Sequence, residues 1–203
     1  MKSEELKYLA LVIMAIALVA FVYGTYKVIQ IVDKTQIGTP EGTYTSYVST
    51  SEEIQNKASR LSKDCKSTLC KVQSVLDFTT NIPYKTHTFQ KKSPQKTIQE
   101  NFGDCDDKSN MLISMLHALD IEAYFVLVPK HIFVIVPSDS MDDSRIKETK
   151  GLWVNEQKYY ILETTAKGSK VGYPFHYKLD DIDAIIEPFS NRKIKFKTLE
   201  YKL

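Results

Sequence analysis

Cys105 is the residue whose type and position point most directly to chemistry. It follows Gly103 and Asp104 at the start of a helix that we expect over residues 105–119, where Asp104 is a good N-cap. The backbone N–H groups at a helix N-terminus lower the pKa of a thiol and can donate hydrogen bonds to a developing oxyanion. Thiol acyl transfer requires both effects, so Cys105 is a candidate nucleophile.

Three aspartates surround this cysteine, namely Asp104, Asp106 and Asp107. Nearby negative charge raises the pKa of a thiol, so these carboxylates oppose the helix dipole. We interpret all three as capping and dipole-compensating residues rather than as catalytic groups. A cationic partner must therefore come from elsewhere in the fold.

His131 and Glu163 are the candidate partners. His131 opens the apolar run HIFVIV, in which alternation puts His131, Phe133 and Ile135 on one face of a strand. Glu163 closes the run KYYILE and can accept a hydrogen bond that fixes the histidine tautomer. If the two strands pair directly and antiparallel, the side chains meet. If the run LWV lies between them, they are about 10 Å apart and no triad forms. The sequence leaves both pairings open.

The order of elements predicts the fold class. Helical patterns over residues 50–61, 67–79 and 105–119, with a short helical turn over 94–99, precede four apolar runs of strand type. The runs are IEAYFVLV, HIFVIV, LWV and KYYILE, and turn residues separate them. Helices followed by consecutive antiparallel strands indicate an α+β domain.

Three of these segments, in this order, carry a family resemblance. GDCDDKS followed by MLISMLHALDIEAYFVLV resembles the cysteine motif of the transglutaminase-like superfamily, HIFVIV resembles its histidine strand, and YYILETTAKGSKVG resembles its acid strand. The resemblance covers residues 94–172 and implies a papain-like α+β fold, with the catalytic cysteine at the N-terminus of a helix packed on an antiparallel sheet. It assigns Cys105 as nucleophile, His131 as general acid and base, and Glu163 as orienting acid, although the family commonly has aspartate there.

The implied activity is attack of the thiol on an amide carbonyl of a protein or peptide. With water as acceptor the enzyme is a peptidase or amidase, with an amine it is a crosslinking transamidase, and a catalytically silent scaffold is the third alternative. Gln99 lies at the spacing that papain-like peptidases use for an oxyanion donor, but a glutamine on a polar helix face needs no such role. The chain has no paired Cys-x-x-Cys or His-x-x-x-His spacing, so we expect no zinc site, and we assign no metal ligand and no cofactor. Calcium dependence stays open, because the acids at 104–107 and Asp139, Asp142 and Asp143 could attract this ion, although scattered surface acids are the commoner explanation.

The N-terminal segment predicts a membrane anchor. Residues 8–26 carry no charge and reach roughly 28 Å as a helix, which spans a bilayer core of about 30 Å. A cleavable signal peptide is the alternative, but its apolar stretch is usually shorter. We therefore divide the chain into an anchor helix over 1–33, a linker over 34–49 and a transglutaminase-like domain over 50–203.

The charge and the cysteine content indicate which binding partners and which cellular compartment to expect. Lysine and arginine total 27 against 25 acidic residues, a net charge of +2, so nucleic acid is not an expected partner. Positive charges flank the anchor on both sides and leave its orientation open. A disulfide between Cys65 and Cys70 would place the domain outside the cytoplasm, whereas two free thiols explain the pair almost as well. We expect a single-pass protein of the cell membrane with an extracytoplasmic domain and protein or peptide substrates near the membrane.

Overall fold

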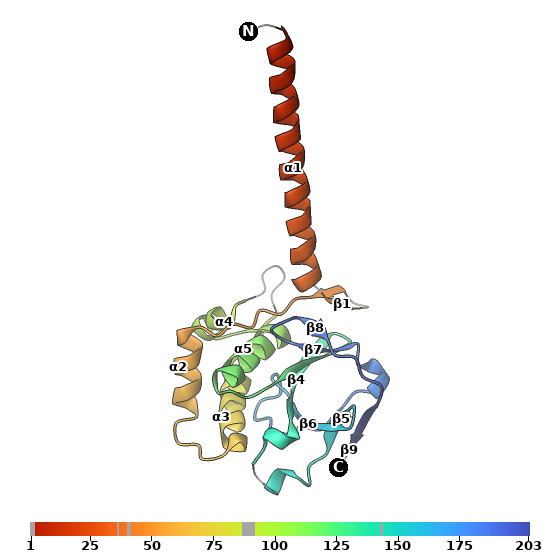
Figure 1. Ribbon diagram of the computed structural model, residues 1–203. Coiled ribbons are helices and arrows are strands. Elements are labelled where there is room, and N and C mark those ends of the chain that lie inside the picture. Colours follow the sequence, from red (N-terminus) through yellow and green to blue (C-terminus); the bar gives the residue numbers. More distant parts are fainter. Residues whose placement is uncertain (1–2, 36, 40–41, 87–91, 143) are drawn as a thin grey trace. The chain divides into compact units, whose positions relative to one another are not determined.

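The computed structural model describes residues 3–35, 37–39, 42–86, 92–142 and 144–203. The chain divides into two compact units, Met1–Gln36 and Ile37–Leu203 (Figure 1). The first unit consists of helix α1 (Ser3–Thr35). The stretch Lys7–Tyr26 of this helix has a mean hydropathy of 2.3 and, by length and composition, can cross a membrane. The predicted N-terminal apolar helix is thus present, with residues 1 and 2 of the expected anchor outside the described residues.

The helices of the second unit begin where side-chain caps favour them. Each has a serine or aspartate at its N-cap, and this side chain accepts a hydrogen bond from a backbone N–H of the first turn. The helices and their caps are α2 (Glu52–Leu61, Ser51), α3 (Thr68–Asn81, Ser67), α4 (Pro94–Glu100, Ser93) and α5 (Cys105–Ala118, Asp104). Short 3-10 turns follow later at η1 (Ser138–Ser140), η2 (Ser144–Ile146) and η3 (Leu179–Asp181).

This unit also contains a seven-stranded antiparallel sheet, in the order β8-β7-β3-β4-β6-β5-β9. The strands are β3 (Tyr124–Val128), β4 (His131–Pro137), β5 (Gly151–Val154), β6 (Gln157–Leu162), β7 (Ala184–Glu187), β8 (Arg192–Lys193) and β9 (Leu199–Lys202). A separate two-stranded hairpin joins β1 (Ile37–Thr39) to β2 (Gly42–Tyr44). Helices and antiparallel strands in one unit confirm the α+β class.

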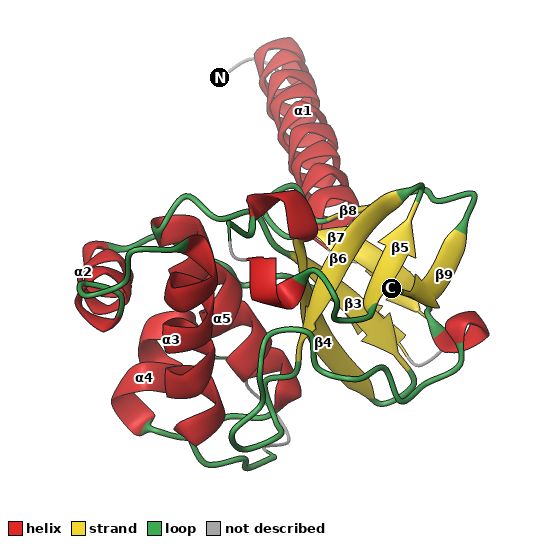
Figure 2. Cartoon of the chain, turned by 90° about the horizontal axis from the view of Figure 1, so that it is seen from below, coloured by secondary structure: helices red, strands yellow, loops and turns green. Residues whose placement is uncertain are grey.

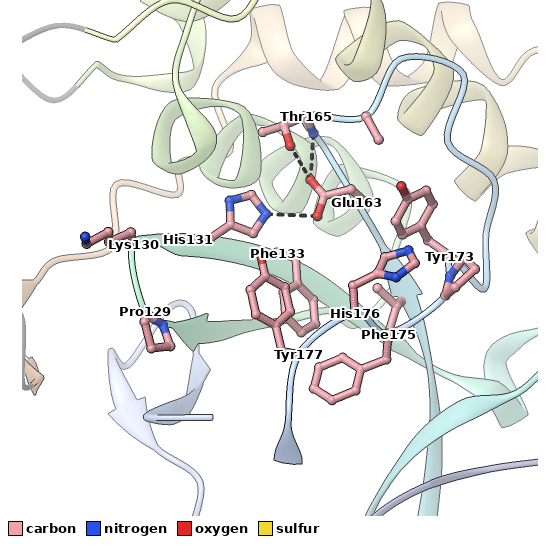
Figure 3. A pocket seen from close by; sticks show the side chains of 13 residues that line it. Pro129, Lys130, His131, Phe133, Glu163, Thr165, Tyr173, Phe175, His176 and Tyr177 are labelled. Atoms are coloured by element: carbon pink, nitrogen blue, oxygen red, sulfur yellow. Dashed lines mark hydrogen bonds and ion pairs between the residues drawn. The ribbon is translucent and has the colours of Figure 1, made fainter. Parts of the chain in front are cut away.

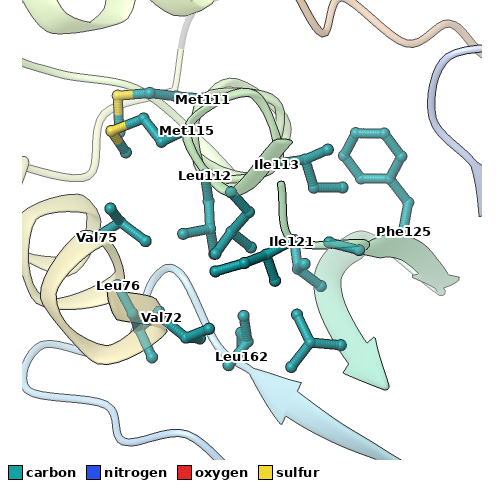
Figure 4. Packing of buried hydrophobic residues seen from close by; sticks show 14 of the residues in the cluster. Val72, Val75, Leu76, Met111, Leu112, Ile113, Met115, Ile121, Phe125 and Leu162 are labelled. Carbon is teal, nitrogen blue, oxygen red and sulfur yellow. The ribbon is translucent and has the colours of Figure 1, made fainter. Parts of the chain in front are cut away.

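The helices gather on one side of the sheet, and α5 packs on β4 (Figure 2). Between these layers, apolar side chains of α3 and α5 meet Leu162 of β6 (Figure 4). The opposite face of the sheet is buried too, because Phe133, Ile135 and Ile161 belong to a second apolar cluster. The central strands therefore read as continuous apolar runs, since both of their faces are covered.

Two segments have structure that the sequence analysis did not describe. Residues 44–49, which we expected to belong to the linker, pack against the domain: Tyr44 is 7% exposed, the Tyr47 N–H donates to Asn110 Oδ1 (2.6 Å), and the Ser49 N–H donates to Ser114 Oγ (3.0 Å). Residues 36, 40 and 41 of the linker lie outside the described residues. Strands β7, β8 and β9 follow the last strand that the sequence predicted. They are short; β7 and β9 pair with β3 and β5, which are distant in sequence, and β8 pairs with its neighbour β7.

Cys65 and Cys70 form a disulfide, with their Cα atoms 5.4 Å apart. Cys65 lies in the turn after α2, and Cys70 lies in the first turn of α3. The break between the two helices lets residues so close in sequence face each other. Of the two states that the sequence left open for this pair, the structure contains the bonded one.

Candidate active site

The start of α5 presents Cys105 as the first helical residue. The Asp104 carboxylate accepts hydrogen bonds from the N–H groups of Asp106 and Asp107, both at 3.1 Å, and the Asp107 carboxylate accepts one from the Asp104 N–H at 3.4 Å. This reciprocal capping box fixes the point at which the helix begins. Asp104 and Asp107 therefore cap the helix, as their positions in the sequence predicted, whereas the Asp106 carboxylate accepts a hydrogen bond from Asn110 Nδ2 at 2.9 Å.

The absence of a side chain at Gly103 lets neighbouring residues pack closely against the backbone just before Cys105. A Cβ atom at this position would lie 2.8 Å from the Cβ of Asp107 and 3.2 Å from Cγ2 of Thr97. The Gly103 backbone pairs with Tyr84, and its carbonyl accepts a hydrogen bond from the Lys85 N–H (3.1 Å). A side chain at Gly103 would thus displace the loop that sets the position of Cys105.

His131 reaches the site at the start of β4, directly after the two-residue turn Pro129-Lys130. Lys130 adopts a left-handed φ of 59°, which closes this turn. Strand β4 pairs directly with β6, with Val134 opposite Leu162, whereas β5 lies on the far side of β6. Of the two pairings that the sequence left open, the structure has the one that brings the histidine strand and the acid strand together.

Glu163 and His131 are in direct contact. Glu163 Oε2 lies 2.9 Å from His131 Nε2, and the two side chains are 11% and 16% exposed. The other carboxylate oxygen, Oε1, accepts hydrogen bonds from the N–H of Thr165 (2.8 Å) and from its hydroxyl (2.6 Å) (Figure 3). Thr165 thus orients the carboxylate, and the carboxylate orients the imidazole.

Cys105, like Glu163, acts on the ionisation of His131. Burial by itself lowers the pKa of His131, but hydrogen bonds with Cys105 and Glu163, together with the negative charges of both groups, raise this pKa to about 9. Since Glu163 occupies Nε2, Nδ1 is the ring nitrogen available to the thiol. The imidazole is therefore protonated at neutral pH and lies beside the Glu163 carboxylate.

The ionisation of Glu163 fits this arrangement. Burial raises the pKa of its carboxyl, but hydrogen bonds from His131 and Thr165 and the charge of the imidazolium lower it below its ordinary value. The carboxylate thus stays ionised at neutral pH and can hold a positively charged imidazole. His131 and Glu163, which the sequence nominated separately, thus lie together with opposite charges.

Ser109 links the three elements that carry the site. It lies one helical turn after Cys105, is fully buried, and contacts the carbonyl of Ile132 at 3.4 Å and the hydroxyl of Thr164 at 3.3 Å. Ile132 directly follows His131, and Thr164 directly follows Glu163. The hydroxyl of Ser109 therefore sets the position of α5 relative to both strands.

Lys108 places a buried positive charge behind the site. Its side chain is 1% exposed, and Nζ donates to the carbonyl of Ile82 at 2.8 Å. Burial lowers the pKa of this amine, and the negative charge of Glu163 partly restores it. The lysine thus satisfies the C-terminal cap of α3 and adds a positive charge to the surroundings of the acid.

Two tyrosines near Cys105 were not singled out by the sequence. The pKa of Tyr84 is raised, first by burial and then by the nearby Cys105. The pKa of Tyr177 is raised as well, first by burial, then by Glu163 and then by Cys105. Tyr84 comes to the site through its pairing with Gly103, which no local pattern announces. Tyr177 lies in the run YPFHY, whose concentration of aromatic residues in a loop was the signal available.

Gln99, the predicted oxyanion donor, is exposed on α4, and its amide donates to Oε2 of Glu53 at 3.3 Å. The structure therefore turns this side chain toward α2 and does not bring it to the three central residues; its oxyanion role stays a prediction. As for metals, the described part of the chain contains no group of three or more His, Cys, Asp or Glu side chains that could hold an ion.

Comparisons with known proteins place this geometry in a family. The profile of the transglutaminase-like superfamily matches residues 55–161, which include Cys105 and His131. No curated protein sequence matches the chain. Among solved structures, a cysteine protease candidate from Cytophaga hutchinsonii is 16% identical, with a TM-score of 0.49, over 78% of this chain and 52% of that one. The chain thus spans about half the length of that protein. Because the family profile covers more than half of its residues, this chain belongs to the transglutaminase-like superfamily.

Proposed function

We propose that the protein is a membrane-anchored cysteine hydrolase that cleaves amide bonds of proteins or peptides through Cys105, His131 and Glu163. The observation that carries this proposal is the position of His131, whose ring contacts Glu163 at 2.9 Å and whose pKa is raised by Cys105 as well as by Glu163. A nucleophile, a base and an orienting acid in that order are the arrangement required for thiol acyl transfer.

The reaction begins with a Cys105 thiolate paired with the His131 imidazolium. The thiolate attacks the amide carbon, and the oxyanion that forms accepts a hydrogen bond from the N–H of Cys105, which the Asp104 cap does not occupy. His131 then gives its proton to the leaving nitrogen, the C–N bond breaks, and a thioester remains on Cys105.

Deacylation reverses these roles. Neutral His131 takes a proton from a water molecule, whose oxygen attacks the thioester carbon and expels the Cys105 sulfur. The products are a carboxylic acid and an amine, and the ion pair is restored. An amine that replaced water in this step would give transamidation on the same three residues.

Alkylation of the purified full-length protein by iodoacetamide tests the assignment without a known substrate. We expect Cys105 to be modified at pH 7 at least about tenfold faster than a cysteine in an unfolded peptide, because a thiolate is the reactive form. The variant His131→Ala removes this advantage, and Cys105→Ser removes the labelling. A rate for Cys105 equal to that of the peptide would favour a silent scaffold and overturn the proposal.

The same proposal places the domain outside the cytoplasm. It rests on the apolar stretch of α1, which can span a membrane, and on the disulfide between Cys65 and Cys70, a bond that persists in oxidising compartments. A membrane-impermeant maleimide applied to intact cells should then label Cys105. Labelling that occurs only after the cells are permeabilised would place the domain inside and overturn this orientation.

A further inference from the structure

A cavity of about 480 Å³ lies beside His131 (Figure 3). His131 and Glu163 form one part of its lining, and Phe133, Tyr173, Phe175 and Tyr177 supply aromatic surface. Phe133 belongs to the apolar cluster on the sheet face opposite the helices, so the cavity opens on that face. Its size is within the range of pockets that bind small ligands or side chains.

The aromatic rings of the cavity are arranged around the catalytic imidazole. The Tyr177 ring stacks with His131, with centroids 6.1 Å apart and planes at 19°, and with Phe133, at 6.3 Å and 11°. The Phe175 ring lies 6.2 Å from Phe133 and 6.0 Å from Tyr177. Tyr177 is nevertheless 37% exposed. An apolar group that entered the cavity would remove this ring surface from water and pack against several rings.

The position of the cavity identifies the part of the substrate that reaches it. In the mechanism above, the acyl group becomes attached to Cys105, and the leaving nitrogen receives its proton from His131. The described residues that line the cavity include His131 and Glu163 but not Cys105. The cavity therefore adjoins the imidazole rather than the sulfur, which is where the leaving amine and the residue attached to it lie.

We propose that this cavity binds a large apolar or aromatic side chain of the residue whose amino group leaves, and so selects substrates on that side of the bond. The proposal rests on the proposed hydrolase function and adds to it a substrate class. By microscopic reversibility, the same cavity binds amines that attack the acyl-enzyme. Amines with aromatic side chains therefore compete with water better than small ones do.

This competition can be measured with the full-length protein in detergent, without a known substrate. p-Nitrophenyl acetate acetylates Cys105 and releases nitrophenol, and the thioester then reacts with water or with an added amino-acid amide to give acetate or an N-acetyl amide. At equal concentration, we expect phenylalaninamide to capture at least about ten times as many acetyl groups as alaninamide. A hydrophobic pocket discriminates between a large and a small apolar side chain by at least this factor. Mass spectrometry measures both products.

Two variants assign the preference to the cavity. Phe175→Ala removes a ring that contacts Phe133 and Tyr177, and Tyr177→Ala removes the ring that stacks with His131. Both should reduce the preference for phenylalaninamide to near unity. The control Phe189→Ala removes an exposed ring that lies 4.1 Å from another histidine, His117, away from the cavity, and should keep the preference.

The outcomes separate the two proposals. A nitrophenol burst with equal capture of both amides, or with a preference that Phe175→Ala leaves intact, overturns the cavity proposal and leaves the hydrolase standing. Absence of any burst that depends on Cys105 overturns both. If Tyr177→Ala loses the burst because His131 moves, the result for Phe175→Ala decides the question.

Discussion

At the scale of single residues, the site depends on the charge state of His131. Burial opposes a charged imidazole, and contacts with Cys105 and Glu163 reverse this effect and raise the pKa to about 9. A group whose pKa is higher in the folded state than in the unfolded state, here about 9 against 6.5, stabilises the fold fully below pH 6.5. This stabilisation is lost as the pH rises through 9. The same titration removes the ion pair, so activity and stability share an alkaline limit.

Replacement of Glu163 should move this limit. Glu163→Gln keeps an oxygen that can accept the Nε2–H hydrogen bond but removes the negative charge, so the pKa of His131 falls. The alkaline limb of kcat/KM should then shift from near 9 toward neutral pH. Glu163→Ala removes both effects and should lower kcat by roughly 10²-fold or more, the scale of a misplaced general base. A pH–rate profile for the three proteins checks this, and an unchanged limb in Glu163→Gln would contradict it.

At the scale of elements, the site depends on how α5 docks against β4 and the segment after β6. Ser109 makes this contact through one hydroxyl, with the backbone of Ile132 and the side chain of Thr164. A second buried serine on the same helix, Ser114, bonds instead to Asn110 and to the backbone of Ser49. The two serines have similar burial and different neighbours, so they form a matched pair for mutation.

Ser109→Ala should therefore affect reactivity as well as stability. Loss of a buried hydrogen-bond partner costs about 1–3 kcal/mol, and we expect this loss for both Ser109→Ala and Ser114→Ala. Only the first variant should also slow the alkylation of Cys105, because only Ser109 ties the cysteine helix to the strands of His131 and Glu163. Thermal denaturation and the iodoacetamide rate measure the two effects. Equal rates of Cys105 alkylation in the two variants would contradict a positioning role for Ser109.

The start of α5 gives a second prediction at this scale. Gly103→Ala places a methyl group 2.8 Å from the Cβ of Asp107 and 3.2 Å from Thr97, so the loop must shift. We expect a loss of about 1–3 kcal/mol, which is typical of overpacking, and slower alkylation of Cys105. Gly24→Ala is the control, because a Cβ at Gly24 meets nothing within 4 Å. A Gly103→Ala protein with wild-type stability would show that Asp107 and Thr97 leave room for a methyl group at this position.

At the scale of the whole molecule, the second compact unit includes residues that the sequence analysis assigned to the linker. The unit begins at Ile37, and Tyr44 is buried in the main apolar cluster. Backbone groups of Tyr47 and Ser49 bond to side chains of α5, the helix that carries Cys105. Residues 44–49 are therefore packed into the domain rather than forming a free tether.

Two truncations test this boundary. A protein of residues 37–203 should be soluble without detergent and should keep the Cys105 alkylation rate of the full chain. A protein of residues 50–203 loses the burial of Tyr44, worth about 1.5–3 kcal/mol, together with two hydrogen bonds to α5. It should unfold at a lower temperature. Equal melting temperatures would show that residues 37–49 add nothing to the fold.

The sequence by itself determined the features that depend on local patterns. Asp104 before Cys105 predicted a capped helix, since capping needs only neighbouring residues. Helical periodicity and apolar runs rich in β-branched and aromatic residues predicted the α+β class and the strands that bring in His131 and Glu163, because burial selects those patterns.

Only the tertiary structure decided which elements meet. A strand that is apolar on both faces carries no mark of its neighbour, so the direct pairing of β4 with β6 had to come from the fold. The same holds for Ser109, for the course of residues 44–49 and for the aromatic cavity. Their contacts join residues far apart in the chain, and such contacts are selected by the packing of the whole core rather than by any local preference.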